Sequence, residues 1–475
     1  MKNVMFIRIL TLAFVSLASP ALVHGASLLE VYQQALQSDP LIHEAESRRQ
    51  AALEITPQAR GLLFPQISAG YQYDTRNAEG TNPLDIGGDI IQVDSSSSRT
   101  NKGWRVDLRQ TLFRWDQWVG LKQAHKLVAK AEVNYEAAQQ DLIVRVVSRY
   151  FNVLAEEDKL TSIHADRTAI ARQLEQAKQR FEVGLIAITD VQESQAAYDQ
   201  SIANEIGAKR SLATAREFLR EITGEYVRVL AAPGEDFPLT SPDPADAESW
   251  TDLALAQNLS LVASRFDEQI ARDEISFRRT GHYPTVDLVV NYSESDSDFS
   301  DIISNGTPQT DFATENQSDS ISIQFSVPIF SGGRTSSRVN EAVYLHRASK
   351  QQLQRIARET ERATRDAYLG VLSEISRVQA LKQAVASSRT ALEATQAGFD
   401  VGTRTIVDVL NSQFTLYLAI TNYYGSRYAY IGNVLRLKQA AGMLQVQDLE
   451  EIDKWLIERR PPEEVIAEED AASSS

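Results

Sequence analysis

The sequence contains no cysteine and only six histidines in 475 residues. The lack of cysteine excludes disulfides, thiolate catalysis, cysteine-ligated metals and an acylated N-terminal cysteine. The histidines stand apart, and no two of them have the spacing of a metal site: His24, His43, His125, His164, His282 and His346. We therefore expect neither a metal nor another cofactor.

Basic residues are fewer than acidic ones, 48 against 64, and the formal net charge is -16 at pH 7. Such a chain is repelled by nucleic acid and by anionic membrane surfaces, so neither is an expected partner. The sequence also lacks a phosphate loop, a nucleophile elbow and a metal-binding helix motif. Ser331–Gly333 is interpreted as a turn from a strand into a helix. The sequence does not indicate an enzyme.

Long apolar runs are confined to the start of the chain. Lys2 and Arg8 flank the apolar run Ile9–Leu17, and small residues follow up to about Gly25. This pattern is typical of a secretory signal peptide over residues 1–25. No later stretch reaches the roughly 18 apolar residues of a membrane-spanning helix, so a membrane domain would have to be a closed β-barrel.

The rest of the chain repeats one plan twice. Phe181–Val191 recurs as Phe399–Val409, and Pro65 and Tyr73 recur at nearly the same offset as Pro284 and Tyr292. This internal duplication predicts a first repeat, a proline-rich link around the middle of the molecule, a second repeat and a disordered acidic tail: residues 26–232, 233–250, 251–457 and 458–475.

Each repeat contains a long stretch without proline, and we expect a helix from Trp115 to Phe181 and another from Gly333 to Phe399. From Leu121 to Val153 apolar residues recur at steps of three and four, as in a coiled coil. A helix of this length extends roughly 100 Å at about 1.5 Å per residue. The pattern therefore favours a tube over a globular core.

A glycine follows each long helix, and a second helix restarts soon afterwards. Gly184 and Gly402 are predicted to be left-handed helix caps, which makes each repeat a long helical hairpin with its tip at the glycine. Thr189 and Gln192 are predicted to form a capping box where the first hairpin restarts.

Four segments alternate apolar and polar residues and are predicted to be strands: 67–73, 104–108, 286–292 and 321–327. Polar loops, 75–102 and 293–319, join them in pairs and are expected to face the outside. The alternation fits a barrel wall and a soluble sandwich equally well. Four strands cannot close around a water-filled pore, and open edges are forbidden in lipid, so three chains would share a barrel of twelve strands.

The two tip segments, Arg180–Gln192 and Val401–Leu410, closely resemble those of the TolC family of outer-membrane channels. Val31–Ala35 and Asn258–Leu261 resemble that family too, in the same order. The resemblance implies an α+β membrane protein, a homotrimer with a twelve-stranded β-barrel in outer-membrane lipid above a long α-helical coiled-coil tunnel in the periplasm. It further implies an exit duct for multidrug efflux or type I protein secretion.

As in that family, the expected partners are a periplasmic adaptor, also called a membrane fusion protein, and an inner-membrane pump of the RND, ABC or MFS type. The duct would open at its periplasmic tip when these partners engage it. Gly184 and Gly402 would be the small positions at which the adaptor docks. The alternative is a periplasmic coiled-coil scaffold, which explains the long helices but not the strands.

The resemblance also implies a gate latch that involves Thr189, Asp190 and Arg404. Phe399 stands where the family commonly has a tyrosine whose hydroxyl supports the latch, so that hydrogen bond cannot form here. From spacing alone, Asp190 could instead stabilise the start of a helix, and Arg404 could pair along its own helix with Asp408.

A constriction ring would be formed by Asp408 and, one helical turn later, by Asn411. The family has a second aspartate at the position of Asn411, so three copies would lose one ring of charge. We expect a leakier resting gate and a weaker block by cations than in a channel with tyrosine and aspartate at these two positions.

Overall fold

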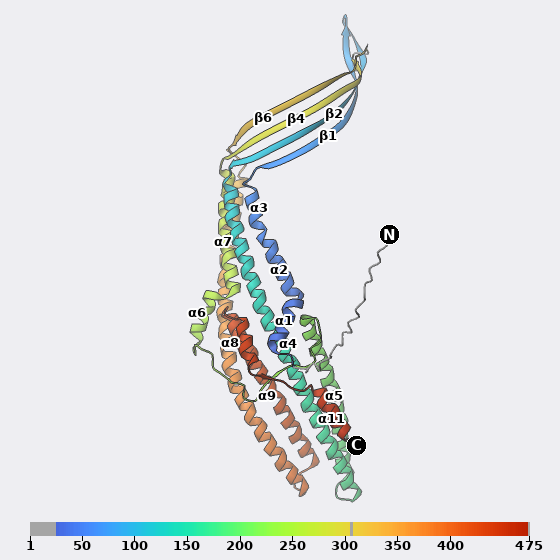
Figure 1. The fold of residues 1–475 in the computed structure, drawn as a ribbon, viewed down its shortest axis with the longest axis vertical. Helices are drawn as coiled ribbons and strands as arrows, with labels where there is room; N and C mark the ends of the chain where they lie inside the picture. The colour runs from blue at the N-terminus through green and yellow to red at the C-terminus, as the bar shows by residue number, and fades with distance from the viewer. Residues whose placement is uncertain (1–24, 305–306, 474–475) are drawn as a thin grey trace, which may run out of the picture.

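The structure is a computed structural model that describes residues 25–304 and 307–473. The predicted signal peptide lies outside these residues, apart from Gly25. Figure 1 shows an elongated molecule with a curved sheet at one end and a column of helices below it. The column ends in the turns of two helical hairpins, at the end of the molecule farthest from the sheet.

Two helices run the length of the column. α4 (Trp115–Glu182) has 68 residues and α8 (Arg334–Asp400) has 67. Both helices were expected, and their predicted ends are confirmed to within one residue. One residue separates α4 from the strand that ends at Phe113, α8 begins after Gly333, and neither contains a proline that would interrupt its hydrogen bonds.

Shorter helices pack in pairs against these two. α5 (Ile188–Thr223) and α9 (Ile406–Ala440) return from the tips along the lower half of α4 and α8. In the upper half, α2 (Pro40–Leu53), α3 (Ile55–Gly61) and α7 (Leu259–Arg279) take their place. Shorter helices therefore flank the two long ones in both halves of the column (Figure 1). No helix among residues 25–304 and 307–473 is both long and apolar enough to cross a membrane.

The sheet contains four long antiparallel strands in the order β1 (Gln66–Ile86), β2 (Asp89–Phe113), β4 (Thr285–Ser304) and β6 (Phe312–Ser326). A short strand, β5 (Thr307–Pro308), also pairs with β4. The register aligns Tyr71 with Trp104, and Val106 with Tyr292. The four predicted strands are thus confirmed.

The strand ends were predicted wrongly. The segments expected to be loops, 75–102 and 293–319, are largely strand, and β1 and β2 pair continuously up to a turn at Gly87 and Gly88. The apolar alternation stops at Tyr73, but the backbone pairing continues with polar side chains, as between Thr75 and Thr100. Backbone hydrogen bonds do not require an apolar face, so the sequence pattern ended before the strands did.

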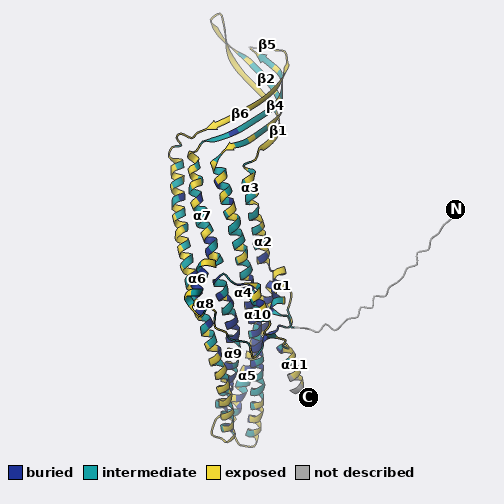
Figure 2. Ribbon diagram, turned by 60° about the vertical axis from the view of Figure 1, so that its left-hand side comes forward, coloured by how far each residue is buried: buried dark blue, intermediate teal, exposed yellow. Residues whose placement is uncertain are grey.

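The most buried part of the column lies at its middle, where Figure 2 shows buried residues concentrated. Here α1 (Leu28–Ser38), α6 (Ala247–Gln257) and α10 (Val446–Asp453) surround the long helices, and η1 (Thr280–His282) ends α7 nearer the sheet. The fully buried Tyr150 donates its hydroxyl hydrogen bond to the carbonyl of Ala231 at 2.6 Å. In this belt α1, near the start of the described residues, packs against both α4 and α10.

The acidic tail is not disordered where the structure describes it. β7 (Leu456–Ile457) pairs with β3 (Ala232–Pro233), and α11 (Pro462–Ser473) packs against α4. Ile466 is 7% exposed, and Glu463 pairs with Arg216 at 2.5 Å. The prediction of disorder was wrong. It rested on the acidic composition, which does not reveal that Ile466 is buried or that Arg216 forms an ion pair with the acidic helix.

Candidate functional site at the hairpin tips

The turns at the two hairpin tips have the same backbone geometry. Gly184 has a φ of +74° and Gly402 has a φ of +78°. In the first tip, the N–H of Leu185 reaches back to the carbonyl of Arg180, and in the second, the N–H of Thr403 reaches that of Gly398. These bonds are the Schellman pattern of a helix end, which confirms the predicted caps. A Cβ atom at either glycine would have no neighbour within 4 Å.

The helices that restart after the two turns are capped differently. α9 begins with a capping box between Thr405 and Asp408. α5 has Ala187 at the corresponding place and no side-chain cap. The predicted capping box of Thr189 and Gln192 was wrong, because Thr189 already lies within the first turn of α5. Only the second tip therefore has a rigidly capped restart.

Asp408 is fixed by this capping box. Its Oδ2 accepts hydrogen bonds from the backbone N–H of Thr405 at 2.9 Å and from the Thr405 hydroxyl at 3.0 Å. These two bonds lower the pKa of Asp408, and the positive charge of Arg404 adds to the effect. The carboxylate therefore remains ionised to a lower pH than an ordinary aspartate. Asn411 follows one helical turn later with an exposed side chain.

The three expected latch residues are not brought together within one chain. Thr189 is exposed, Asp190 is half-buried, and no hydrogen bond or ion pair of the described residues joins either side chain to Arg404. The stem of Arg404 instead lies across Gly398, where a Cβ atom would be 2.8 Å from the Arg404 Cγ. The absence of a side chain at Gly398 makes room for the arginine.

A different set of residues joins the two tips. Nη2 of Arg180, at the end of α4, lies 3.0 Å from Oδ1 of Asp400, at the end of α8. The Arg180 guanidinium also lies 4.8 Å from the centre of the Phe399 ring. Phe399 is 8% exposed and packs with Ile406 and Val409. Sequence reasoning missed Arg180 and Asp400. A signal was available, because the two repeats differ at this position: Gly398 in the second repeat is the counterpart of Arg180 in the first.

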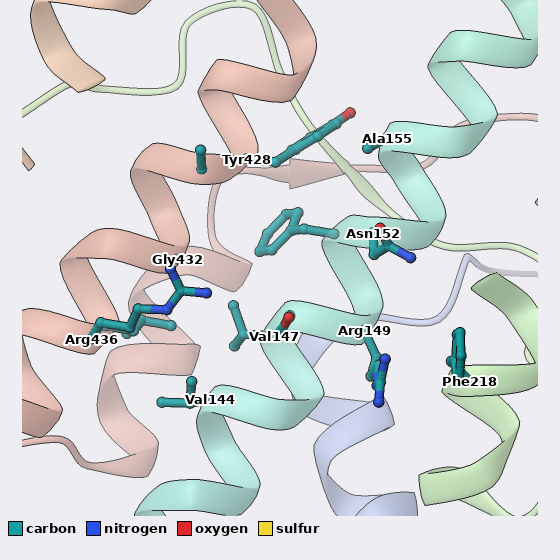
Figure 3. A pocket seen from close by; sticks show the side chains of 13 residues that line it. Val144, Val147, Arg149, Asn152, Ala155, Phe218, Tyr428, Gly432 and Arg436 are labelled. Atoms are coloured by element: carbon teal, nitrogen blue, oxygen red, sulfur yellow. The ribbon is translucent and has the colours of Figure 1, made fainter. Parts of the chain in front are cut away.

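The column also contains a cavity of about 390 Å³ between α4 and α9, with Phe218 of α5 at its rim (Figure 3). Arg149 lies with its guanidinium carbon 4.5 Å from the centre of the Phe218 ring. The described residues that line the cavity include two arginines but no carboxylate, histidine or thiol. Nor do the described residues contain a group of three or more potential metal ligands.

Comparisons with known proteins agree with this geometry. The profile of the outer membrane efflux protein family matches residues 31–225 and 250–443. Outer membrane protein TolC of Vibrio cholerae is 37% identical over 434 residues, which cover 91% of this chain and 94% of that protein. Alkaline protease secretion protein AprF of Pseudomonas aeruginosa is 28% identical, with 89% and 86% covered.

The crystal structure of the outer membrane protein VceC of Vibrio cholerae superposes with a TM-score of 0.68 at 16% identity, over 87% of this chain and 96% of VceC. This likeness establishes the fold class, a β-barrel sheet that continues into a long helical tunnel. The chain belongs to the outer membrane efflux protein family. It is an outer-membrane exit duct for efflux and secretion, and the alternative of a scaffold without a pore is set aside.

Proposed function

We propose that three copies of the chain form one duct, with twelve strands closed into a barrel and three helical columns closed into a periplasmic tunnel. The observation that carries this proposal is the pair of open sheet edges: within the described chain, β1 and β6 each pair along one side only. Large apolar side chains stand exposed on both strands, among them Tyr73 at 65% and Ile321 at 77%. Open edges are forbidden in lipid, so each β1 pairs with a neighbouring β6.

The closed tip is held between copies by the family latch. Thr189 and Asp190 of one copy would meet Arg404 of a neighbouring copy, because these side chains have no such link within their own chain. A partly exposed ion pair contributes about 0 to 1 kcal/mol, which suits a gate that has to open. The duct itself needs no catalytic group, and we propose no cofactor for it.

The constriction is a ring of three Asp408 carboxylates at the tip, with a neutral ring of three Asn411 side chains one helical turn closer to the barrel. Asn411→Asp should lower the concentration of divalent cation that half-blocks the current by about tenfold, since three added charges bind a cation more tightly. Phe399→Tyr should lower the resting current by supplying the missing hydroxyl. Both are measured in planar bilayers, with Asn411→Gln as the neutral control. A half-blocking concentration unchanged by Asn411→Asp would contradict the ring.

Gly184 and Gly402 form the docking positions for the tip of a periplasmic adaptor, which in turn recruits an inner-membrane pump of the RND, ABC or MFS type. Their open surroundings support this role, because no atom of the described residues lies within 4 Å of a Cβ placed at either glycine. The name of AprF supports a type I protein secretion system as one user of the duct. TolC and the family description support multidrug efflux as another.

Complementation of a deletion strain tests the assembled duct. The natural chain should restore both drug resistance and protein secretion, whereas Gly402→Trp should abolish both and still yield a detergent-stable trimer. Gly402→Asn is the matched control, because asparagine tolerates a left-handed backbone and is small. Full resistance in the tryptophan variant would exclude docking at this glycine. A monomeric mass for the extracted natural protein would contradict the duct.

A further inference from the structure

The contact of Arg180 with Asp400 and Phe399 is the direct side-chain link between the two tips of one chain. Arg180 ends the first hairpin's long helix, whereas the other two residues end the second hairpin's long helix. The ion pair is 3.0 Å long, and the cation lies 4.8 Å from the centre of the aromatic ring. One side chain therefore makes two attractive contacts across the gap between the hairpins.

The aromatic residue is held in place for this contact. Phe399 is 8% exposed and is packed by Ile406 and Val409, which belong to the restarting helix α9. Its face is turned toward the cation, which is the arrangement of a cation–π contact. The ring at this position thus contacts a residue of the other hairpin without a tyrosine hydroxyl.

The contact is also easy to break. Arg180 and Asp400 side chains are 31% and 51% exposed, so water can solvate both charges after they separate. Gln396, one turn earlier on α8, donates a second hydrogen bond to Oδ1 of Asp400 at 3.4 Å. Asp400 therefore keeps a partner on its own helix when the arginine leaves. Such a contact can form and break without holding the tip permanently in either its closed or its open state.

We propose that Arg180, Asp400 and Phe399 form a tip clasp, which holds the two hairpins of each copy together while the duct is closed. The inference rests on the proposed function, in which the duct opens at this tip. Opening moves one hairpin away from the other and separates the arginine from both partners. The clasp works within each copy, whereas the latch of Thr189, Asp190 and Arg404 works between copies.

Bilayer currents test the clasp through two single variants and their combination. Arg180→Gln should raise the open probability at low salt by about fivefold, the size expected for one exposed ion pair with a cation–π contact, and Asp400→Asn should raise it less, because it leaves the cation–π contact in place. The double variant should open no more than Arg180→Gln alone, because that variant already removes both contacts of Arg180. At about 1 M salt the natural channel should approach the variants, since screening weakens the ion pair.

The matched control is Arg355→Gln. Arg355 pairs with Glu359 at 2.7 Å on the same helix, with both side chains at least half exposed, and it should leave the current unchanged. Exchanging the charges, with Arg180→Asp and Asp400→Arg together, should restore much of the natural closure. Additive effects of the two single variants, or single variants that conduct like the natural channel, would overturn the clasp.

A second measurement does not depend on current. The chain has no cysteine, so spin labels can be placed at Val183→Cys and Val401→Cys, whose parent side chains are 70% and 75% exposed. In trimers diluted with unlabelled chains, Arg180→Gln should lengthen and broaden the distance between the two labels. An unchanged distance would overturn the clasp even if the duct conducts. If the natural chain forms no channel, the proposed duct is wrong. The distance between the two spin labels still tests the clasp in that case.

Discussion

Gly442→Ala is expected to destabilise the fold by about 3 kcal/mol or more, the largest effect of any glycine substitution considered. Gly442 ends α9 with a φ of +74°. A Cβ atom there would lie 2.4 Å from the carbonyl oxygen of Gln257, at the junction of α6 and α7. Backbone cannot rotate away as a side chain can, so the end of α9 and the junction of α6 and α7 would have to move apart. Thermal unfolding in detergent, followed by circular dichroism, measures the loss.

Two other glycines separate backbone strain from this collision. Gly402 has nearly the same φ but open surroundings, so Gly402→Ala should cost only about 1 kcal/mol of left-handed strain. Gly224, the counterpart of Gly442 in the first repeat, would meet Cβ and Oγ of Ser38 at 3.3 Å, a tight contact but not a collision. Gly224→Ala should therefore fall between the two. Equal losses in all three variants would show that the close contact with Gln257 does not matter.

The long helices and the tips could be predicted because their signals are local. Proline-free stretches allow α4 and α8 to run uninterrupted, and Gly184 and Gly402 adopt the left-handed backbone just after their ends. The strands could be located for the same reason, from the alternation of side chains between two faces. The division into two repeats stays a prediction about the origin of the fold.

The parts that were missed depend on partners far away in the sequence. The polar ends of β1 and β2 are strand because the other strand is there to pair with them. Likewise α11 is ordered because α4 and α5 offer it a surface. The contact of Arg180 with Asp400 joins residues that only the packing of two hairpins brings together. Local patterns carry no information on such contacts.

The same limit applies to the buried charge that receives the tail. Asp158 on α4 has a side chain only 1% exposed, and it forms an ion pair with Arg459, just before α11. The hydroxyl of Tyr428 on α9 donates a hydrogen bond to the other carboxylate oxygen. Burial, followed by the charge of Asp158, raises the pKa of Tyr428 well above its ordinary value, so this hydroxyl stays protonated and keeps donating.

Arg459→Ala should therefore destabilise the fold by about 2 kcal/mol, because it leaves a buried carboxylate with one neutral donor. The effect stays below that of a fully buried pair, since a third of the Arg459 side chain is exposed and water can enter. Arg460→Ala is the control: its pair with Glu468 is 71% exposed on both sides and should contribute almost nothing.

Combining Arg459→Ala with Asp158→Asn should recover part of the loss, because an amide tolerates burial without a counter-charge better than a carboxylate does. The measurement is the thermal unfolding temperature of the natural protein, Arg459→Ala, Arg460→Ala and the double variant. If Arg459→Ala unfolds at the same temperature as Arg460→Ala, the tail lies on the column without stabilising it. If the double variant is no more stable than Arg459→Ala, the loss comes from packing of the arginine stem and not from the stranded charge.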